Sequence, residues 1–180
     1  MSNIIAKAAS YACNAHEGQF RKYFKERPYF THVLTVASKV SKWAFEYPNG
    51  KSLVAVAFLH DVVEDCGVTF DDLTKEFGQE VADGVSWLTS YSKTINSKEK
   101  RAIRKQQDRD HLAKAPLVYK RIKANDRISN LEDVLEKCEP YFALLYADES
   151  EQLLEVIKSN EQESQYLANL IQKIRAQYAS

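Results

Sequence analysis

The sequence predicts an all-helical fold. Only five glycines and four prolines occur in 180 residues, so few positions mark turns. No strongly alternating apolar and polar pattern, which would be typical of strands, recurs along the chain. Residues 52–66 form a nearly continuous apolar segment, which indicates a helix buried on most sides. With 44% hydrophobic and 28% charged residues, the composition is that of a globular protein with a packed core.

The length favours one domain, because 180 residues can enclose one hydrophobic core but not two comfortable ones. No internal repeat, low-complexity tract or linker divides the chain. We therefore predict a single domain over residues 1–180. Its motif-bearing core covers about residues 6–134, and C-terminal helices cover residues 140–178.

The individual helices follow from apolar segments and helix-capping residues. Thr31 is expected to cap the second helix, and Thr69 with Asp72 resembles a capping box. A loop rich in Arg, Lys and aromatic residues is expected over residues 18–28. The predicted helices cover residues 3–17, 32–45, 52–66, 69–77, 79–88, 97–113 and 117–138, with two more after Pro140 and near Gln162.

The formal net charge is zero, but the charges are segregated along the chain. Residues 97–123 carry ten Lys or Arg against three acidic residues, and residues 132–163 carry ten acidic residues against two Lys. A basic helix at 97–114 beside a catalytic centre would attract an anionic substrate. A plain solvated helix face explains the same run equally well, so both interpretations stay open.

The three cysteines, Cys13, Cys66 and Cys138, show no CxxC spacing. This argues against a disulfide framework or a zinc-cysteine site and fits a reducing compartment. No apolar stretch approaches the roughly 18 residues that span a membrane, and the N-terminus lacks a signal-peptide pattern. We therefore expect a cytoplasmic protein with no membrane partner. The basic helix lacks the interleaved aromatic residues of a single-strand platform, so no nucleic acid partner is expected.

Ionisable residues concentrate at the end of the most apolar helix, in the segment His60-Asp61-Val62-Val63-Glu64-Asp65. Buried carboxylates there are costly unless they are paired or coordinate a cation. On one helix, Glu64 would lie one turn after His60, and Asp65 one turn after Asp61. Imidazole and carboxylate ligands suit Mn²⁺, Fe²⁺ or Zn²⁺ better than Ca²⁺.

Two further candidate ligands are His32, beside Val33 and Leu34, and Asp126, which precedes Arg127. His32 could instead be a simple helix-start residue, and Asp126 an ion-pair partner of Arg127. Composition and spacing do not decide between these interpretations.

Several ordered segments resemble the hydrolase domain of the RelA/SpoT family, within the HD superfamily of phosphohydrolases, and its small stand-alone members. They span roughly residues 6–134: AHEGQFRK at 15–22, PYFTH at 28–32, LHDVVED at 59–65, FG at 77–78 with Val81, and KANDRISNL at 123–131. The resemblance implies an HD-type helical bundle and a nucleotide-processing enzyme.

The site residues are carried over by matching positions in those segments. The resemblance implies that His32, His60, Asp61 and Asp126 bind a metal ion, usually Mn²⁺ in the family. It further implies that Glu64 and Asp65 activate and position the attacking water, and that Arg21, Lys22 and Asn130 contact the nucleotide. The implied reaction removes pyrophosphate from the 3′ position of guanosine tetra- and pentaphosphate, ppGpp and pppGpp.

The chain departs from the family between Lys22 and Pro28, where five residues replace a short glycine-containing link. Asn125 also stands where the family usually has a small or apolar residue. Phe24 and Tyr29 could stack on a base or belong to the core. Two alternatives therefore stay open: a phosphatase for another nucleotide, such as a nucleoside monophosphate or NADPH, and a catalytically silent nucleotide-binding module. The oligomeric state is not indicated.

Overall fold

The computed structural model describes residues 3–90, 100–158 and 161–178. The predicted helical fold is confirmed, and the described residues add one two-stranded hairpin, β1 (Phe20–Arg21) and β2 (Phe24–Pro28). Among these residues, every helix is too short or too polar to cross a membrane. The start of the predicted basic helix, residues 97–99, lies outside the described residues.

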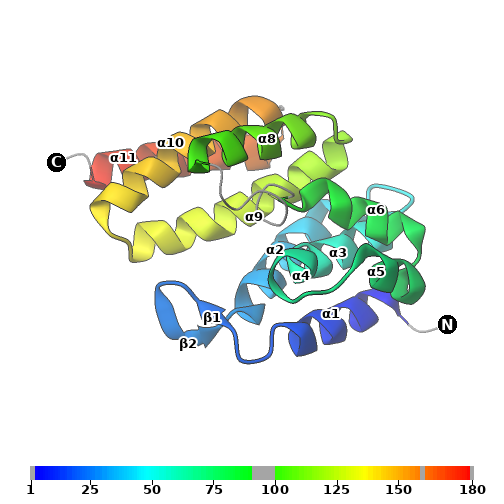
Figure 1. Ribbon diagram of the computed structural model, residues 1–180. Coiled ribbons are helices and arrows are strands. Elements are labelled where there is room, and N and C mark those ends of the chain that lie inside the picture. Colours follow the sequence, from blue (N-terminus) through cyan, green and yellow to red (C-terminus); the bar gives the residue numbers. More distant parts are fainter. Residues whose placement is uncertain (1–2, 91–99, 159–160, 179–180) are drawn as a thin grey trace.

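The N-terminal helices surround one central helix, α3 (Figure 1). Residues 53–59 of α3 are all buried, because α1, α2 and α6 pack around this helix. The prediction that the most apolar helix lies in the middle of the bundle is therefore confirmed. The elements of this half are α1 (Ile4–Ala15), α2 (Phe30–Ala44), α3 (Gly50–Leu59), α4 (Val62–Asp65), α5 (Phe70–Phe77) and α6 (Gln79–Leu88).

The C-terminal helices form a second group, which Figure 1 shows above the first. Helix α9 joins the two groups, because it packs against α2 on one side and against α10 and α11 on the other. Side chains on α9 can therefore meet side chains from α2 and from the end of α3. The elements of this group are α8 (Arg101–Ala113), α9 (Leu117–Glu136), α10 (Pro140–Ile157) and α11 (Gln162–Tyr178).

The expected loop over residues 18–28 is a hairpin, so that prediction is wrong. Phe24 is buried beneath the guanidinium of Arg27, which lies 3.8 Å from the ring centroid. Arg27 also forms an ion pair of 3.2 Å with Asp133 on α9. The contact between Arg27 and Asp133 joins residues 106 positions apart, so a local sequence pattern could not reveal it.

Two expected helix boundaries also differ. Thr31 does not cap α2, which begins at Phe30; its hydroxyl donates instead to the carbonyl of Pro28 at 2.7 Å. The helix expected over residues 52–66 ends at Leu59, and α4 starts at Val62. His60 and Glu64 therefore do not share one continuous helix. The capping box of Thr69 and Asp72 is confirmed at the start of α5.

Candidate metal centre

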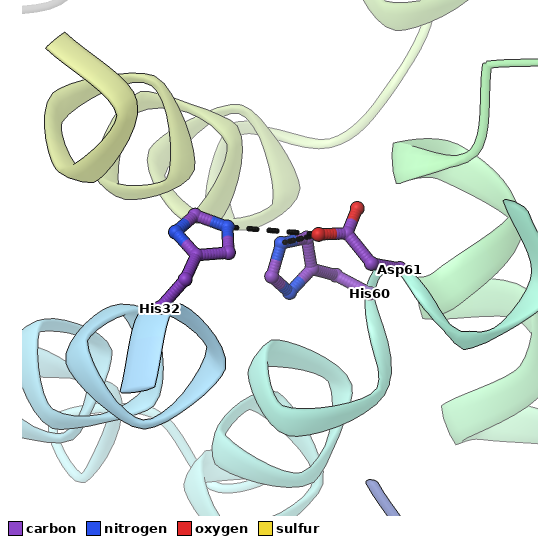
Figure 2. Close-up of side chains that lie close together, drawn as sticks. All are labelled: His32, His60 and Asp61. Carbon is purple, nitrogen blue, oxygen red and sulfur yellow. Dashed lines mark ion pairs between the residues drawn. The ribbon is translucent and has the colours of Figure 1, made fainter. Parts of the chain in front are cut away.

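Four of the predicted site residues converge where α2, the α3–α4 junction and α9 meet. His32 Nε2 lies 3.5 Å from Asp61 Oδ2 and 3.3 Å from Asp126 Oδ1. His60 Nε2 lies 3.0 Å from Asp61 Oδ2 and 3.8 Å from Asp126 Oδ1. Figure 2 shows the imidazole of His32, from α2, pointing toward the side chains of His60 and Asp61, which come from the junction after α3.

The chemistry of these groups fits a divalent cation. His32 and His60 are only 2% and 1% exposed, and the Nε2 atom of each has no hydrogen-bond partner. A buried polar atom without a partner costs free energy, which a bound ion would remove. Two imidazole nitrogens and two carboxylates form a donor set that transition metals accept.

The remaining ring nitrogens hold both imidazoles in place. His60 Nδ1 is 2.8 Å from the carbonyl of Ala57, to which it donates a hydrogen bond. His32 Nδ1 is 2.9 Å from the hydroxyl of Ser129. The carbonyl of Ala57 can only accept, so it holds His60 with a proton on Nδ1 and with Nε2 directed at the centre. The hydroxyl of Ser129 can donate or accept, and it fixes the direction of the His32 ring.

Neighbouring side chains position the two carboxylates in the same way. Tyr29 donates its hydroxyl proton to Asp61 Oδ2 at 2.6 Å. Lys123 lies 2.8 Å from Asp126 Oδ2, and Asn130 donates to Asp126 Oδ1 at 2.7 Å. Lys123 and Asn130 stand three residues before and four after Asp126, so helical spacing could have identified both as its neighbours.

Neighbouring charges keep Asp61 and Lys123 in their charged forms, although both side chains are buried. Burial alone would raise the pKa of Asp61, but the adjacent His60 lowers it well below its usual range. Burial likewise disfavours a charged Lys123, yet Asp126 raises the pKa of this ammonium group above its ordinary value. The pKa of Tyr29 is raised by burial and then by Asp61, so its hydroxyl keeps its proton as a donor.

Glu64 and Asp65 lie on α4, directly after the α3–α4 junction. Glu64 is half-buried and accepts a hydrogen bond of 2.6 Å from the backbone N–H of Ser90. Burial lowers the pKa of Lys123, whereas the charges of Asp126 and then Glu64 raise it. The Glu64 carboxylate therefore lies near enough to act on the ammonium group that contacts Asp126. Asp65 is exposed, and its backbone carbonyl accepts from the side chain of Gln19 at 3.0 Å.

The predicted substrate-contacting residues line a pocket of about 190 Å³ beside the hairpin, which we call the hairpin pocket. Lys22 reaches over Phe142, with Nζ 3.9 Å from the ring centroid. Aromatic side chains supply much of the remaining wall. The residues that line it are Arg21, Lys22, Tyr23, Tyr29, Asn130, Asp133, Val134, Phe142 and Tyr146.

Arg21 is committed to protein partners within this pocket. Its Nε lies 2.7 Å from Asp133 Oδ2, and its Nη2 donates to Asn130 Oδ1 at 2.9 Å. Asn130 in turn contacts Asp126, so a chain of hydrogen bonds connects the hairpin to the centre. Sequence reasoning missed Asp133, since nothing in its local sequence distinguishes it from the neighbouring acidic residues.

Comparisons with known proteins show what the chain is similar to. The HD domain family matches residues 8–153. Guanosine-3′,5′-bis(diphosphate) 3′-pyrophosphohydrolase MESH1 of Xenopus tropicalis is 34% identical over 140 residues, which cover 76% of this chain and 72% of the relative. MESH1 of Drosophila melanogaster is 36% identical over 124 residues, which cover 69% of this chain and 65% of the relative.

A solved structure extends the similarity to nearly the whole chain. It is described as a metazoan ortholog of SpoT that hydrolyses ppGpp and plays a role in starvation responses. The two structures superpose with a TM-score of 0.76 and 25% sequence identity, covering 98% of this chain and 96% of the other.

Proposed function

Because the chain belongs to the HD domain family of MESH1-type hydrolases, we propose that it hydrolyses the 3′-pyrophosphate of ppGpp and pppGpp. The products would be GDP or GTP and pyrophosphate. The observation that carries the proposal is the pair of buried histidine Nε2 atoms that face two carboxylates and have no hydrogen-bond partner. Such a set is expensive to keep buried unless a cation joins it.

In this proposal His32, His60, Asp61 and Asp126 hold the ion, with Mn²⁺ as the expected metal. A bound divalent ion supplies polarisation of the phosphoryl group and makes water more acidic. Glu64, whose charge acts on Lys123 beside Asp126, accepts the proton of the attacking water, and Asp65 helps to orient that water. Phosphoryl transfer otherwise depends on positioning and charge neutralisation, which cationic side chains provide.

The hairpin pocket is the expected place for the nucleoside. Its volume of about 190 Å³ and its aromatic walls suit a base or a ribose, and it adjoins the centre through Asn130. Lys22 contributes a cation at the rim. Arg21, held by Asp133, acts mainly by fixing the shape of this wall.

A second candidate keeps the centre and changes the nucleotide. The five residues between Lys22 and Pro28 form part of the hairpin, and Tyr23 from this segment lines the pocket. A wall built from such an insertion could favour a base other than guanine. A nucleoside monophosphate or an NADPH-like substrate would then lose orthophosphate.

The test measures pyrophosphate and orthophosphate released by Mn²⁺-loaded protein from ppGpp, NADPH and nucleoside monophosphates. Pyrophosphate from ppGpp that requires the metal supports the proposal. Orthophosphate from another nucleotide, with ppGpp inert, supports the second candidate. Bound metal without any turnover contradicts both and favours a silent nucleotide-binding module.

A further inference from the structure

A second, smaller pocket lies beside the centre, between α6, α8, α9 and α10, and we call it the α8 pocket. Its volume is about 50 Å³. Since a single water needs roughly 10–15 Å³ of such space, it can take a few waters or one phosphate group, but not a nucleobase. The ionisable side chains that line it are Lys105, Arg109, Lys123, Arg127, Asp108 and Glu149.

The positive charges in this pocket exceed the negative ones, and the acidic groups are already paired. Arg101 holds Glu149 with two contacts, of 2.6 Å and 2.9 Å. Asp108 Oδ2 lies 3.7 Å from Lys105 Nζ, within one turn of α8. Buried cations that face one another repel, so this pocket favours an anion between them.

Lys105 is one of the two cations that α8 contributes to this pocket, with Arg109. Burial lowers the pKa of its ammonium group, and the nearby charges of Arg127 and Lys123 lower it further. Arg127 is buried as well, with Nη1 donating to the neutral hydroxyl of Ser150 at 3.3 Å. Within the described residues, no carboxylate is in direct contact with Arg127. An anion bound here would therefore relieve the repulsion among Arg127, Lys123 and Lys105.

The α8 pocket and the hairpin pocket lie along one face of α9. Asn130 lines the hairpin pocket, Asp126 belongs to the centre, and Lys123 lines the α8 pocket. Spacings of three and four residues place these side chains on successive turns of one face, over roughly 10 Å of helix. From Asn130 to Lys123, a ligand lying along α9 would therefore contact the hairpin pocket with its nucleoside, the metal position next, and the α8 pocket last.

From this order we infer that the α8 pocket receives the outer phosphate of the 3′-pyrophosphate, with Lys105, Lys123 and Arg127 as its contacts. The inference rests on the proposed function for the identity of the substrate. The inner phosphate lies at the centre, where water attacks it and the bond to the 3′ oxygen of the ribose breaks. The 3′ oxygen of the ribose keeps the electron pair of the broken bond and takes up a proton, so the nucleotide leaves with a 3′-hydroxyl. The pyrophosphate gains the oxygen of the attacking water and is still held by the three cations.

The basic helix α8 then has a definite role. From the sequence alone, the basic residues of this helix could equally contact a phosphate or form a solvated surface. Lys105 supports the first interpretation, whereas Arg101 binds Glu149 and serves to attach α8 to α10. The pocket's small volume also excludes a second nucleotide from this position.

The test is calorimetric titration of inorganic pyrophosphate into Mn²⁺-loaded protein, without any nucleotide. Lys105→Gln should weaken pyrophosphate binding about 10- to 100-fold, the effect of losing a charged hydrogen bond. Lys105→Arg should keep most of the affinity, since the charge remains. Lys114→Gln is the matched control, because Lys114 ends α8 on the exposed surface; it should stay within about twofold, as expected for a screened surface charge.

A second binding measurement separates the contribution of the outer phosphate from that of the rest of the ligand. Lys105→Gln should weaken the binding of ppGpp but not that of an analogue with a single 3′-phosphate. Equal losses in Lys105→Gln and Lys114→Gln, or unchanged pyrophosphate affinity in Lys105→Gln, would overturn the inference. If ppGpp is not hydrolysed but pyrophosphate binding depends on Lys105, the proposed function fails while the phosphate pocket stands.

Discussion

Each histidine of the centre uses its two ring nitrogens for different tasks. The Nδ1 atoms contact Ala57 and Ser129, and the Nε2 atoms face Asp61 and Asp126. This division means that orientation comes from the protein alone and exists before any ion binds. Substitutions at orienting groups should therefore change metal affinity without removing a ligand.

Tyr29→Phe tests that expectation, because it removes only the hydroxyl that donates to Asp61 at 2.6 Å. Affinity for Mn²⁺ should fall about 10- to 100-fold, the range seen when such an outer partner is lost. Titration followed by calorimetry or metal analysis measures the change. Tyr141→Phe is the control, since Tyr141 is 81% exposed and should leave the affinity unchanged. Equal affinity in both variants would contradict the role of Tyr29.

Glu64→Gln tests the proposed proton acceptor. The amide keeps the shape of the side chain and can still accept from the N–H of Ser90, but it cannot take a proton from water. We expect kcat to drop about 10²- to 10⁴-fold while metal content stays constant. Glu17→Gln, an exposed carboxylate of the same type, provides the control. A variant with normal turnover would remove Glu64 from the mechanism.

The sequence identified the residues that lie next to one another in the chain better than those that meet only in space. His60 and Asp61 were evident as polar residues at the end of an apolar helix. Tyr29 could have been core or base-stacking, and its bond to Asp61 depends on the packing of α2 against α3. Ser129 gave no signal at all, because its partner His32 is 97 residues away.

At the level of elements, α6 approaches α3 and α9 closely at Gly84. A Cβ atom at Gly84 would lie 2.5 Å from Val56 Cγ2 and 2.9 Å from Cε1 of Tyr119. A Cβ atom essentially never comes so close to another heavy atom, so a side chain here would require Val56 and Tyr119, or the helices that carry them, to move. The absence of a side chain at residue 84 is thus a packing requirement.

Gly84→Val should lower the free energy of unfolding by about 1–3 kcal/mol, as an overfilled core does. Urea denaturation gives this value. The double variant Gly84→Val with Val56→Ala removes the main clashing atoms, so its loss should be smaller than the sum of the two single losses. Strictly additive losses would mean that the two residues do not compete for the same space.

Local patterns predicted most helices but not the hairpin or the break after α3. The capping box at α5 and the helices after Pro140 and Gln162 rely on neighbouring residues, and they match the structure. The hairpin relies on Arg21 and Arg27 reaching Asp133, a contact between distant segments. At the break, the side chain of His60 bonds back to the carbonyl of Ala57, a contact that an apolar pattern does not indicate.

At the level of the whole molecule, the centre joins the two groups of helices. His32, His60 and Asp61 come from the N-terminal group, and Asp126 comes from α9, which packs against α10 and α11. An ion bound by all four would link both groups. The organisation of residues 1–180 as one domain stays a prediction. A metal ion that links both groups of helices would support this prediction.

Metal binding should therefore stabilise the entire fold. At a free ion concentration one hundred times Kd, the gain is about 2.7 kcal/mol. For a chain of this size, that corresponds to a rise in Tm of roughly 5–11 °C. Thermal unfolding with Mn²⁺ and with a chelator measures it. Asp61→Ala removes a ligand and should show no such rise, whereas Asp71→Ala, an exposed carboxylate, should behave like the wild type. An equal rise in Asp61→Ala would place the ion elsewhere.

The hydrogen bond from His60 to Ala57 gives the end of α3 a further property. One contact both satisfies a carbonyl near the last turn of the helix and aims the opposite nitrogen at the ion. We therefore expect the last turn of α3 to fray when the ion is lost, and to become ordered again when the ion binds. Amide hydrogen exchange at residues 60–62 should report occupancy directly, slowing as the ion concentration rises, even in a variant with no measurable turnover.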